Sequence, residues 1–195
     1  MEIEMKNPIE QKDNVTILVI AGHPADMFDH CGGTLYHHLN RGDSVSCISL
    51  TQGLRIHDEV IDGVLRHDID KYTDDELEQI CEERQWVKYA EVIEACGLFG
   101  ITDVRFLDYD DEVLTVNEQM ILKLARVIRE VKPDIVITHW PYQAGVFGSH
   151  HAITGQLALE AINVANGVDF TNRTPAHRVG QVACMLCPTD TMARN

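Results

Sequence analysis

The sequence lacks a long hydrophobic run, an excess of positive charge and any internal repeat or low-complexity tract. The apolar run nearest its start, Val15–Gly22, is far shorter than the about 20 residues of a membrane-spanning helix. Only 16 Lys and Arg stand against 31 Asp and Glu, which gives a formal net charge of −15. Proteins that bind nucleic-acid phosphates or anionic membranes need a basic face, so we expect neither kind of partner.

The N-terminal segment and the cysteines indicate a reducing compartment. Met1–Asn14 is polar and charged, unlike a secretory signal. Most of the six cysteines lie in apolar or helical patterns, where Cys behaves as a small hydrophobic residue. Cys184 and Cys187 form a CxxC pair, but without a second pair the apolar context favours core packing over a zinc or redox site. We therefore expect free thiols and a cytoplasmic protein.

Short apolar runs alternate with segments of helical periodicity. Strands are expected at Val15–Ala21, Val45–Thr51, Val104–Leu107, Ile135–Thr138 and Gln181–Cys187, and helices at Gly32–Arg41, 74–96, Val116–Val131 and His151–Val164. Residues 52–73 have little periodicity and many charges, which predicts a long surface loop. Alternating strands and helices predict an α/β fold, a Rossmann-like three-layer sandwich with a mostly parallel sheet.

The length fits a single domain over residues 1–195. Within it we expect residues 1–13 to form a polar extension and residues 190–195 a tail, and the sequence leaves open whether the chain is truncated there. A homo-oligomer is also left open.

Histidines and a carboxylate follow two of the expected strands. His23 and Asp26 come after the first strand, and His150 and His151 come after the fourth. Such folds bind ligands at the carboxyl ends of their strands. Two histidines and one carboxylate with open positions are typical of a catalytic zinc or non-haem iron site. The alternative at this point is a set of ordinary polar loop residues.

Several separate blocks resemble the LmbE/PIG-L family of zinc-dependent de-N-acetylases. The family's His-Pro-Asp-Asp-Glu loop corresponds to His23–Met27 (HPADM), and Gly32–Thr34 (GGT) stands at the family's offset. Val127–His139 is similar to the run into the family's fourth strand, and Gly148–His151 (GSHH) aligns with its His-x-Asp-His block. The resemblance extends over nearly the whole chain from about Asn14.

Carried over position by position, the resemblance implies one zinc ion held by His23, Asp26 and His151. The metal would lower the pKa of a bound water to about 7 and polarise the carbonyl of a small-molecule substrate.

Departures from the family pattern affect the catalytic positions. Ala25 stands where the family has its general base, Met27 replaces an acidic residue, and His150 replaces an Asp. Three explanations compete: an engineered Asp→Ala change at position 25, a different base with His150 as the best-placed candidate, or a different reaction. A branch of the family that resembles 4-oxalomesaconate hydratase also has Ala at the base position. Its chemistry is the addition of water to a carbon–carbon double bond of an anionic acid.

Further residues are candidates for the substrate pocket. Arg55 and His57 could hold an anionic group, Asp29 and His30 could line the pocket, and Trp140 could wall it. The leading prediction is a metal-dependent hydrolase that cleaves an N-acyl bond of a small polar or sugar-like substrate. The alternatives are a zinc-dependent hydratase of an unsaturated carboxylic acid and a catalytically impaired protein that only binds ligand.

Overall fold

The computed structural model describes residues 13–142 and 148–186. The elements in chain order are β1 (Thr16–Ala21), α1 (Asp26–Arg41), β2 (Ser44–Thr51), α2 (Leu54–His57), α3 (Glu59–Asp68), the 3-10 helix η1 (Ile69–Lys71), α4 (Asp74–Phe99), β3 (Asp103–Tyr109), α5 (Glu118–Val131), β4 (Ile135–His139), α6 (Gly148–Asn166) and β5 (Gln181–Met185). Across these described ranges, no helix has both the length and the apolar character needed to cross a membrane.

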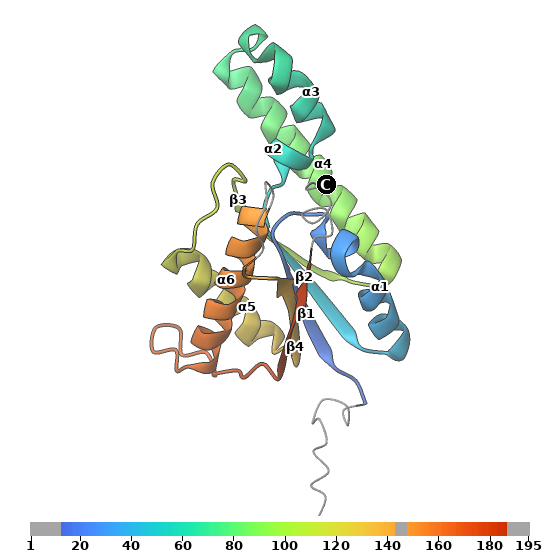
Figure 1. Ribbon diagram of the computed structural model, residues 1–195, viewed down its shortest axis with the longest axis vertical. Helices are drawn as coiled ribbons and strands as arrows, with labels where there is room; N and C mark the ends of the chain where they lie inside the picture. The colour runs from blue at the N-terminus through green and yellow to red at the C-terminus, as the bar shows by residue number, and fades with distance from the viewer. Residues whose placement is uncertain (1–12, 143–147, 187–195) are drawn as a thin grey trace, which may run out of the picture.

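The five strands form one parallel sheet in the order β3-β2-β1-β4-β5. Helices α1 and α4 lie on one face of this sheet, and α5 and α6 lie on the other (Figure 1). The predicted α/β three-layer fold is therefore confirmed.

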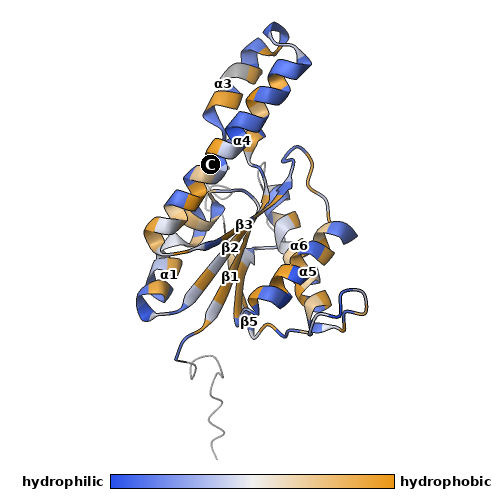
Figure 2. Ribbon diagram, turned by 180° about the vertical axis from the view of Figure 1, so that it is seen from behind, coloured by the Kyte–Doolittle hydropathy of each residue, from blue (hydrophilic) through white to orange (hydrophobic). Residues whose placement is uncertain are grey.

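Strand β1 supplies side chains to a hydrophobic core on each face of the sheet. Ile17 and Val19 pack in the cluster beneath α1 and α4, whereas Leu18 and Ile20 pack in the cluster beneath α5 and α6. Successive side chains of a strand point to opposite faces, so a strand covered on both sides has an apolar residue at every position. The apolar stretches of the central strands are coloured orange in Figure 2.

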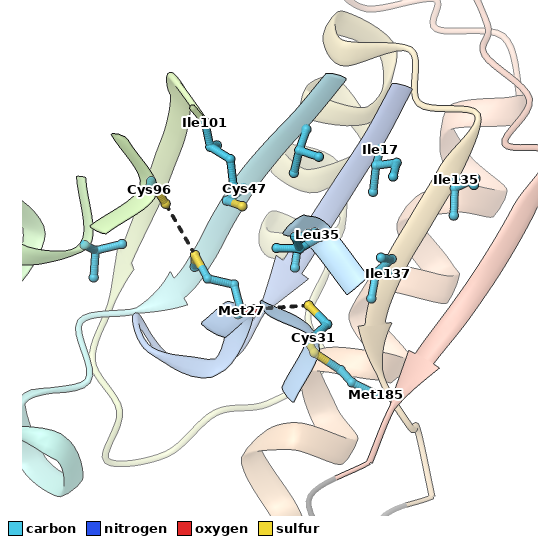
Figure 3. Close-up of a cluster of buried hydrophobic side chains, with 14 of the residues drawn as sticks. Ile17, Met27, Cys31, Leu35, Cys47, Cys96, Ile101, Ile135, Ile137 and Met185 are labelled. Atoms are coloured by element: carbon cyan, nitrogen blue, oxygen red, sulfur yellow. Dashed lines mark hydrogen bonds between the residues drawn. The ribbon is translucent and has the colours of Figure 1, made fainter. Parts of the chain in front are cut away.

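Met27 belongs to this core, although its family counterpart is acidic. Its side chain is fully buried, and its sulfur lies 3.9 Å from the Cys96 sulfur on α4 (Figure 3). The Cys31 thiol donates to the Met27 carbonyl at 3.2 Å. Position 27 therefore joins α1 to α4 by packing, and a carboxylate there would be buried in an apolar environment.

The order of the strands places a crevice above β1 and β4. From β1 the chain continues to one side through β2 and β3, and then returns to the other side through β4 and β5. Ligands of open α/β sheets bind at this reversal point, beyond the carboxyl ends of the strands. The loop after β1 and the start of α6 both lie at this place (Figure 1).

The prediction of a loop over residues 52–73 is wrong, because this segment folds into α2, α3 and η1. Asp58 caps α3 by accepting from the Ile61 N–H at 2.9 Å. It also receives the Arg84 guanidinium of α4 at 2.9–3.1 Å. This cap and ion pair join α3 to the N-terminal half of α4, and the two helices project beyond the sheet as an arm (Figure 1).

Two other local expectations need correction. Helix α1 begins at Asp26 rather than at Gly32, and its N-cap residue, Ala25, makes no side-chain cap hydrogen bond that would mark the start. Cys184 is exposed on the edge strand β5 rather than packed in the core, while Cys187 lies outside the described residues. The five cysteines of the described ranges are free thiols, as expected.

Candidate functional site

The loop after β1 is held in place by the end of β2. The Gly22 carbonyl accepts from the Thr51 hydroxyl at 2.8 Å and from the Thr51 N–H at 3.0 Å. Gly53 follows with a φ of 68°, and a Cβ at this position would lie 2.6 Å from Cδ of Pro24. Only glycine accepts both this conformation and this close approach, so Gly53 fixes the loop that bears His23.

Helix α6 approaches β4 closely at a second glycine. A Cβ on Gly155 would lie 2.3 Å from the His139 carbonyl oxygen. This contact brings the first turn of α6, with His151, over the end of β4. The rings of His139 and His151 stack at 4.0 Å with an interplanar angle of 3°.

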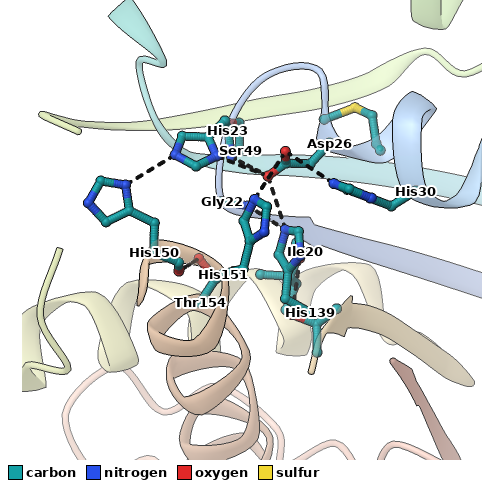
Figure 4. A network of polar contacts seen from close by, with 12 residues as sticks. Ile20, Gly22, His23, Asp26, His30, Ser49, His139, His150, His151 and Thr154 are labelled. Carbon is teal, nitrogen blue, oxygen red and sulfur yellow. Dashed lines mark hydrogen bonds and ion pairs between the residues drawn. The ribbon is translucent and has the colours of Figure 1, made fainter. Parts of the chain in front are cut away.

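Asp26 is the centre of the polar network that results (Figure 4). Its side chain is 6% exposed, and Oδ2 accepts from the His23 N–H at 2.7 Å and lies 3.0 Å from His139 Nε2. Oδ1 lies 3.5 Å from His151 Nε2. Burial opposes ionisation of Asp26, yet the nearby imidazoles of His139, His151 and His23 hold its pKa well below the usual value. The carboxylate is therefore charged and surrounded by imidazoles.

His23, Asp26 and His151 form a group that could hold a metal ion. Each of them offers one ligand atom, and these atoms all lie within 4.8 Å of one another. His23 Nδ1 and both ring nitrogens of His151 are buried without a hydrogen-bond partner. Leaving buried polar atoms unpaired is costly, and a cation between them would satisfy them. Neutral imidazoles and a carboxylate are also the donor set that zinc accepts, so the residues fit the metal.

Two further histidines flank His23 on its other sides. His150 Nδ1 lies 3.2 Å from His23 Nε2, and the His57 ring meets the His23 ring edge-on at 4.6 Å. Desolvation, followed by the neighbouring His23, lowers the pKa of His150 and lowers that of His57 to about 4. Both imidazoles are therefore neutral at pH 7.

Ala25 faces a cavity of about 300 Å³ next to this cluster. The cavity lies between the loop after β1 and α4, and it is lined by Pro24, Ala25, Phe28, His57, Lys88, Glu91, Val92 and Ala95. Its volume is at the lower end of the range for small-molecule pockets. The sequence did not predict that α4 contributes to the wall of this cavity. Its wall residues lie far along the chain from the loop after β1 and belong to no sequence motif.

The other candidate substrate residues are more peripheral. The Arg55 guanidinium binds Asp110 at 2.7–2.9 Å and lies 3.2 Å from Glu112, so its charge is already compensated. Asp29 is exposed on α1. Trp140 is 43% exposed and packs edge-on against Tyr142.

His30, by contrast, points toward the cluster. Its Nε2 lies 3.8 Å from Asp26 Oδ1 (Figure 4). His139, a residue of β4, also faces Asp26. It is fully buried against that carboxylate, and burial lowers its pKa to about 4 in spite of it.

Solved structures of similar fold include two enzymes. N,N'-diacetylchitobiose deacetylase from Pyrococcus horikoshii superposes with a TM-score of 0.72 at 20% identity, over 95% of this chain and 64% of that one. The 4-carboxy-2-hydroxymuconate hydratase GalB from Pseudomonas putida superposes with a TM-score of 0.68 at 21% identity, over 86% of this chain and 64% of that one. At such identities the likeness shows the fold alone, and this chain spans less than two thirds of either protein.

Comparison with the curated proteins found no match. The family described as PIG-L, GlcNAc-PI de-N-acetylase, matches residues 18–162, a range that extends from within β1 to within α6. This range includes His23, Asp26, His150 and His151, and the match covers well over half of the 195 residues. The chain therefore belongs to the PIG-L (LmbE) family.

Proposed function

We propose that this protein is a metal-dependent hydrolase that cleaves an N-acyl bond, such as an N-acetyl group, of a small, neutral, polar substrate. The observation that carries the proposal is the buried His23, Asp26 and His151 group, whose ligand atoms lie within 4.8 Å of one another and include unpaired nitrogen atoms. Membership of the PIG-L family and the deacetylase among the similar structures support the same reaction class.

The chain's own residues would hold the metal and move the proton. A zinc ion bound by His23, Asp26 and His151 would supply activation of water, with a pKa near 7, and polarisation of the substrate carbonyl. His150 replaces the family base in this scheme, because its ring lies 3.2 Å from His23 and is neutral at pH 7. It would take up the proton that water loses and return it to the leaving nitrogen.

The cavity beside Ala25 is our candidate for the substrate site. Phe28 and Val92 offer apolar contacts, while Lys88 and Glu91 offer polar ones of opposite sign. Lys88 already donates to the His57 carbonyl at 2.6 Å, and Arg55 is paired with Asp110. With these cations engaged, a neutral substrate such as an N-acetylated amino sugar suits the site better than a dianion.

A hydratase of unsaturated carboxylic acids is the second candidate. The observation that favours it is Ala25 itself, because a methyl group at the base position cannot accept a proton during amide hydrolysis. The hydratase GalB among the similar structures belongs to this reaction class. The third candidate is a protein that binds ligand without turnover.

Metal content and turnover together test the proposal. We expect one bound zinc per chain, lost when His23, Asp26 and His151 are all replaced by Ala, and kept in the exposed arm variant His67→Ala. Full zinc occupancy in the triple variant would overturn the proposed site.

The zinc-loaded protein is then offered N-acetylamino sugars and unsaturated dicarboxylic acids in parallel. Release of free amine from the sugars supports the hydrolase. Hydration of the acids without amine release supports the hydratase instead, and no turnover of either class with zinc bound supports the binding protein.

A further inference from the structure

His30 is a buried histidine that the family's three-residue metal set does not include. Its side chain is only 8% exposed, and its Nδ1 is buried without a hydrogen-bond partner. Its Nε2 points at Asp26 Oδ1 from 3.8 Å (Figure 4). Its ring also lies near the rings of His139 and His151, at 5.6 and 5.4 Å. An imidazole in this position has little to bind except the carboxylate and whatever cation that carboxylate holds.

The helix gives Asp26 and His30 a shared direction. They lie four residues apart in the first turns of α1, so their side chains point to the same side of the helix. This is the spacing at which two side chains of one helix bind the same metal in helical zinc motifs. His37 and His38, further along α1, lack this relation: His37 is exposed, and His38 binds Asp43 at 2.6 Å.

The distances around Asp26 Oδ1 suit a common cation. His151 Nε2 lies 3.5 Å from this oxygen, and His30 Nε2 lies 3.8 Å from it. With metal–ligand bonds of about 2.0–2.1 Å, ligand atoms on a tetrahedral ion lie about 3.3–3.4 Å apart. His30 Nε2 therefore lies about 0.4 Å beyond the ligand spacing to Asp26 Oδ1, and its side chain must move toward the His23, Asp26 and His151 group to join it.

We propose that His30 is a fourth protein ligand of the metal, so that three imidazoles and one carboxylate hold the ion. The inference rests on the metal site of the proposed function, and it deepens the description of that site. Four protein ligands complete a tetrahedral shell. Water and substrate can then enter only if the ion accepts a fifth ligand, which favours ions that readily adopt five or six ligands.

Cobalt(II) in place of zinc provides a count of the imidazoles. Each histidine bound to paramagnetic cobalt gives one strongly shifted, exchangeable ring N–H signal in the proton NMR spectrum. The buried Nδ1 of His30 protects such a proton from exchange. We expect three of these signals in the natural protein, two in His30→Ala and three in the control His37→Ala.

Metal affinity gives a second readout. Competition with a chromophoric chelator should show at least a tenfold weaker binding of cobalt by His30→Ala, and no change in His37→Ala. If His30→Ala fails to fold, His30→Gln keeps a polar side chain without an imidazole and should also show two signals.

Two outcomes would overturn the inference in distinguishable ways. Two signals in the natural protein that persist in His30→Ala would show that His30 acts, at most, through Asp26, and would leave the three-ligand site intact. No uptake of cobalt by the natural protein would remove the metal site itself, and with it the proposed function.

Discussion

The side chain at position 25 bears directly on the chemistry that this site can perform. Ala25 is exposed and lines the cavity, and the resemblance implies that it stands where the family has its base. A carboxylate at this position would stand next to the metal-binding group without displacing a buried neighbour. The position is therefore open to a direct test by substitution.

The variant Ala25→Asp should gain N-deacetylase activity. A general base typically contributes about 10²–10⁴-fold in rate, so we expect kcat for an N-acetylated sugar to rise within that range. The measurement is release of free amine by the zinc-loaded variant. Ala25→Asn is the matched control, since it has the same size but accepts no proton, and it should remain at the natural level. Equal gains in both variants would contradict a role as base.

The residues of the candidate metal site could be predicted from sequence, whereas the wall of the cavity could not. His23 and Asp26 directly follow one buried strand and His151 follows another, so a parallel sheet brings them to the same edge, while the family resemblance singled out these three residues. The pairing of Arg55 with Asp110 depends on the loop after β3 and has no local pattern. Lys88 reaches the cavity only because α4 packs beside the loop after β1, a tertiary contact without a sequence motif.

At the scale of elements, Arg129 ties α5 to the end of α6. It is 6% exposed, and its guanidinium donates to the Val164, Ala165 and Gly167 carbonyls and to Asp169. The carbonyls belong to the last turn of α6 and to the residue that follows it. Carbonyls at the end of a helix have no partner within the helix. One buried side chain therefore caps the helix that brings His151 to the site.

The variant Arg129→Met should lower the free energy of unfolding by about 2–4 kcal/mol. It removes the ion pair with Asp169 and the hydrogen bonds from the guanidinium to three carbonyls, and a hydrogen bond of a charged group contributes about 1.5–3 kcal/mol. Urea denaturation followed by circular dichroism measures the change. Arg126→Met is the control on the same helix, because Arg126 is exposed, and it should change stability by less than about 0.5 kcal/mol. Similar losses in both variants would contradict the capping role.

The arm formed by α3 and the N-terminal half of α4 depends on Asp58. Desolvation by burial opposes its ionisation, but the Arg84 hydrogen bonds and the Ile61 N–H hold its pKa below the usual value. A carboxyl group whose pKa is lower in the folded state contributes stability above its unfolded pKa. That contribution is lost as the pH falls through the lower, folded value.

The stability advantage of the natural protein over Asp58→Asn should therefore depend on pH. We expect it to be at least about 1 kcal/mol at pH 6–7, since a helix cap and an ion pair are lost together, and to shrink below about pH 4. Urea denaturation between pH 3 and 7 measures this difference. The control Asp62→Asn removes a surface pair with Arg66 and should give a small, nearly constant difference. An advantage that grows as the pH falls would contradict the assigned ion pair.

In the arm, the sequence contained a helical pattern that was too weak to predict its helices. Ile61 and Leu65 stand four residues apart, which is helical spacing, but the many charges between residues 52 and 73 concealed it. Strands β1, β2 and β4 were predictable within one residue because they are covered on both faces and therefore rich in apolar, β-branched residues. The start of α1 was not, because its cap position contains Ala25 instead of a capping side chain.

At the scale of the whole molecule, the charge of −15 acts on every ligand that approaches. Asp26 is ionised within the site, Arg55 is neutralised by Asp110 and Glu112, and Lys88 binds a carbonyl. An anionic substrate would thus be repelled at long range, whereas a neutral one would not. Salt screens such repulsion over a distance of about 10 Å at 0.1 M ionic strength.

The dependence of kcat/KM on salt should separate these two classes of substrate. For a neutral N-acetylated sugar, we expect kcat/KM to stay constant between about 0.01 and 0.3 M salt. For the matched sugar bearing a carboxylate, we expect kcat/KM to rise several-fold, because screening removes the repulsion that slows its association. Steady-state kinetics of the zinc-loaded protein with both sugars provides the comparison, and the neutral sugar controls for effects of salt on the protein. A fall of kcat/KM for the anionic sugar would mean that the metal and its surroundings reverse the field at the site. The site would then favour anionic acids, and the hydratase would become the better-supported function.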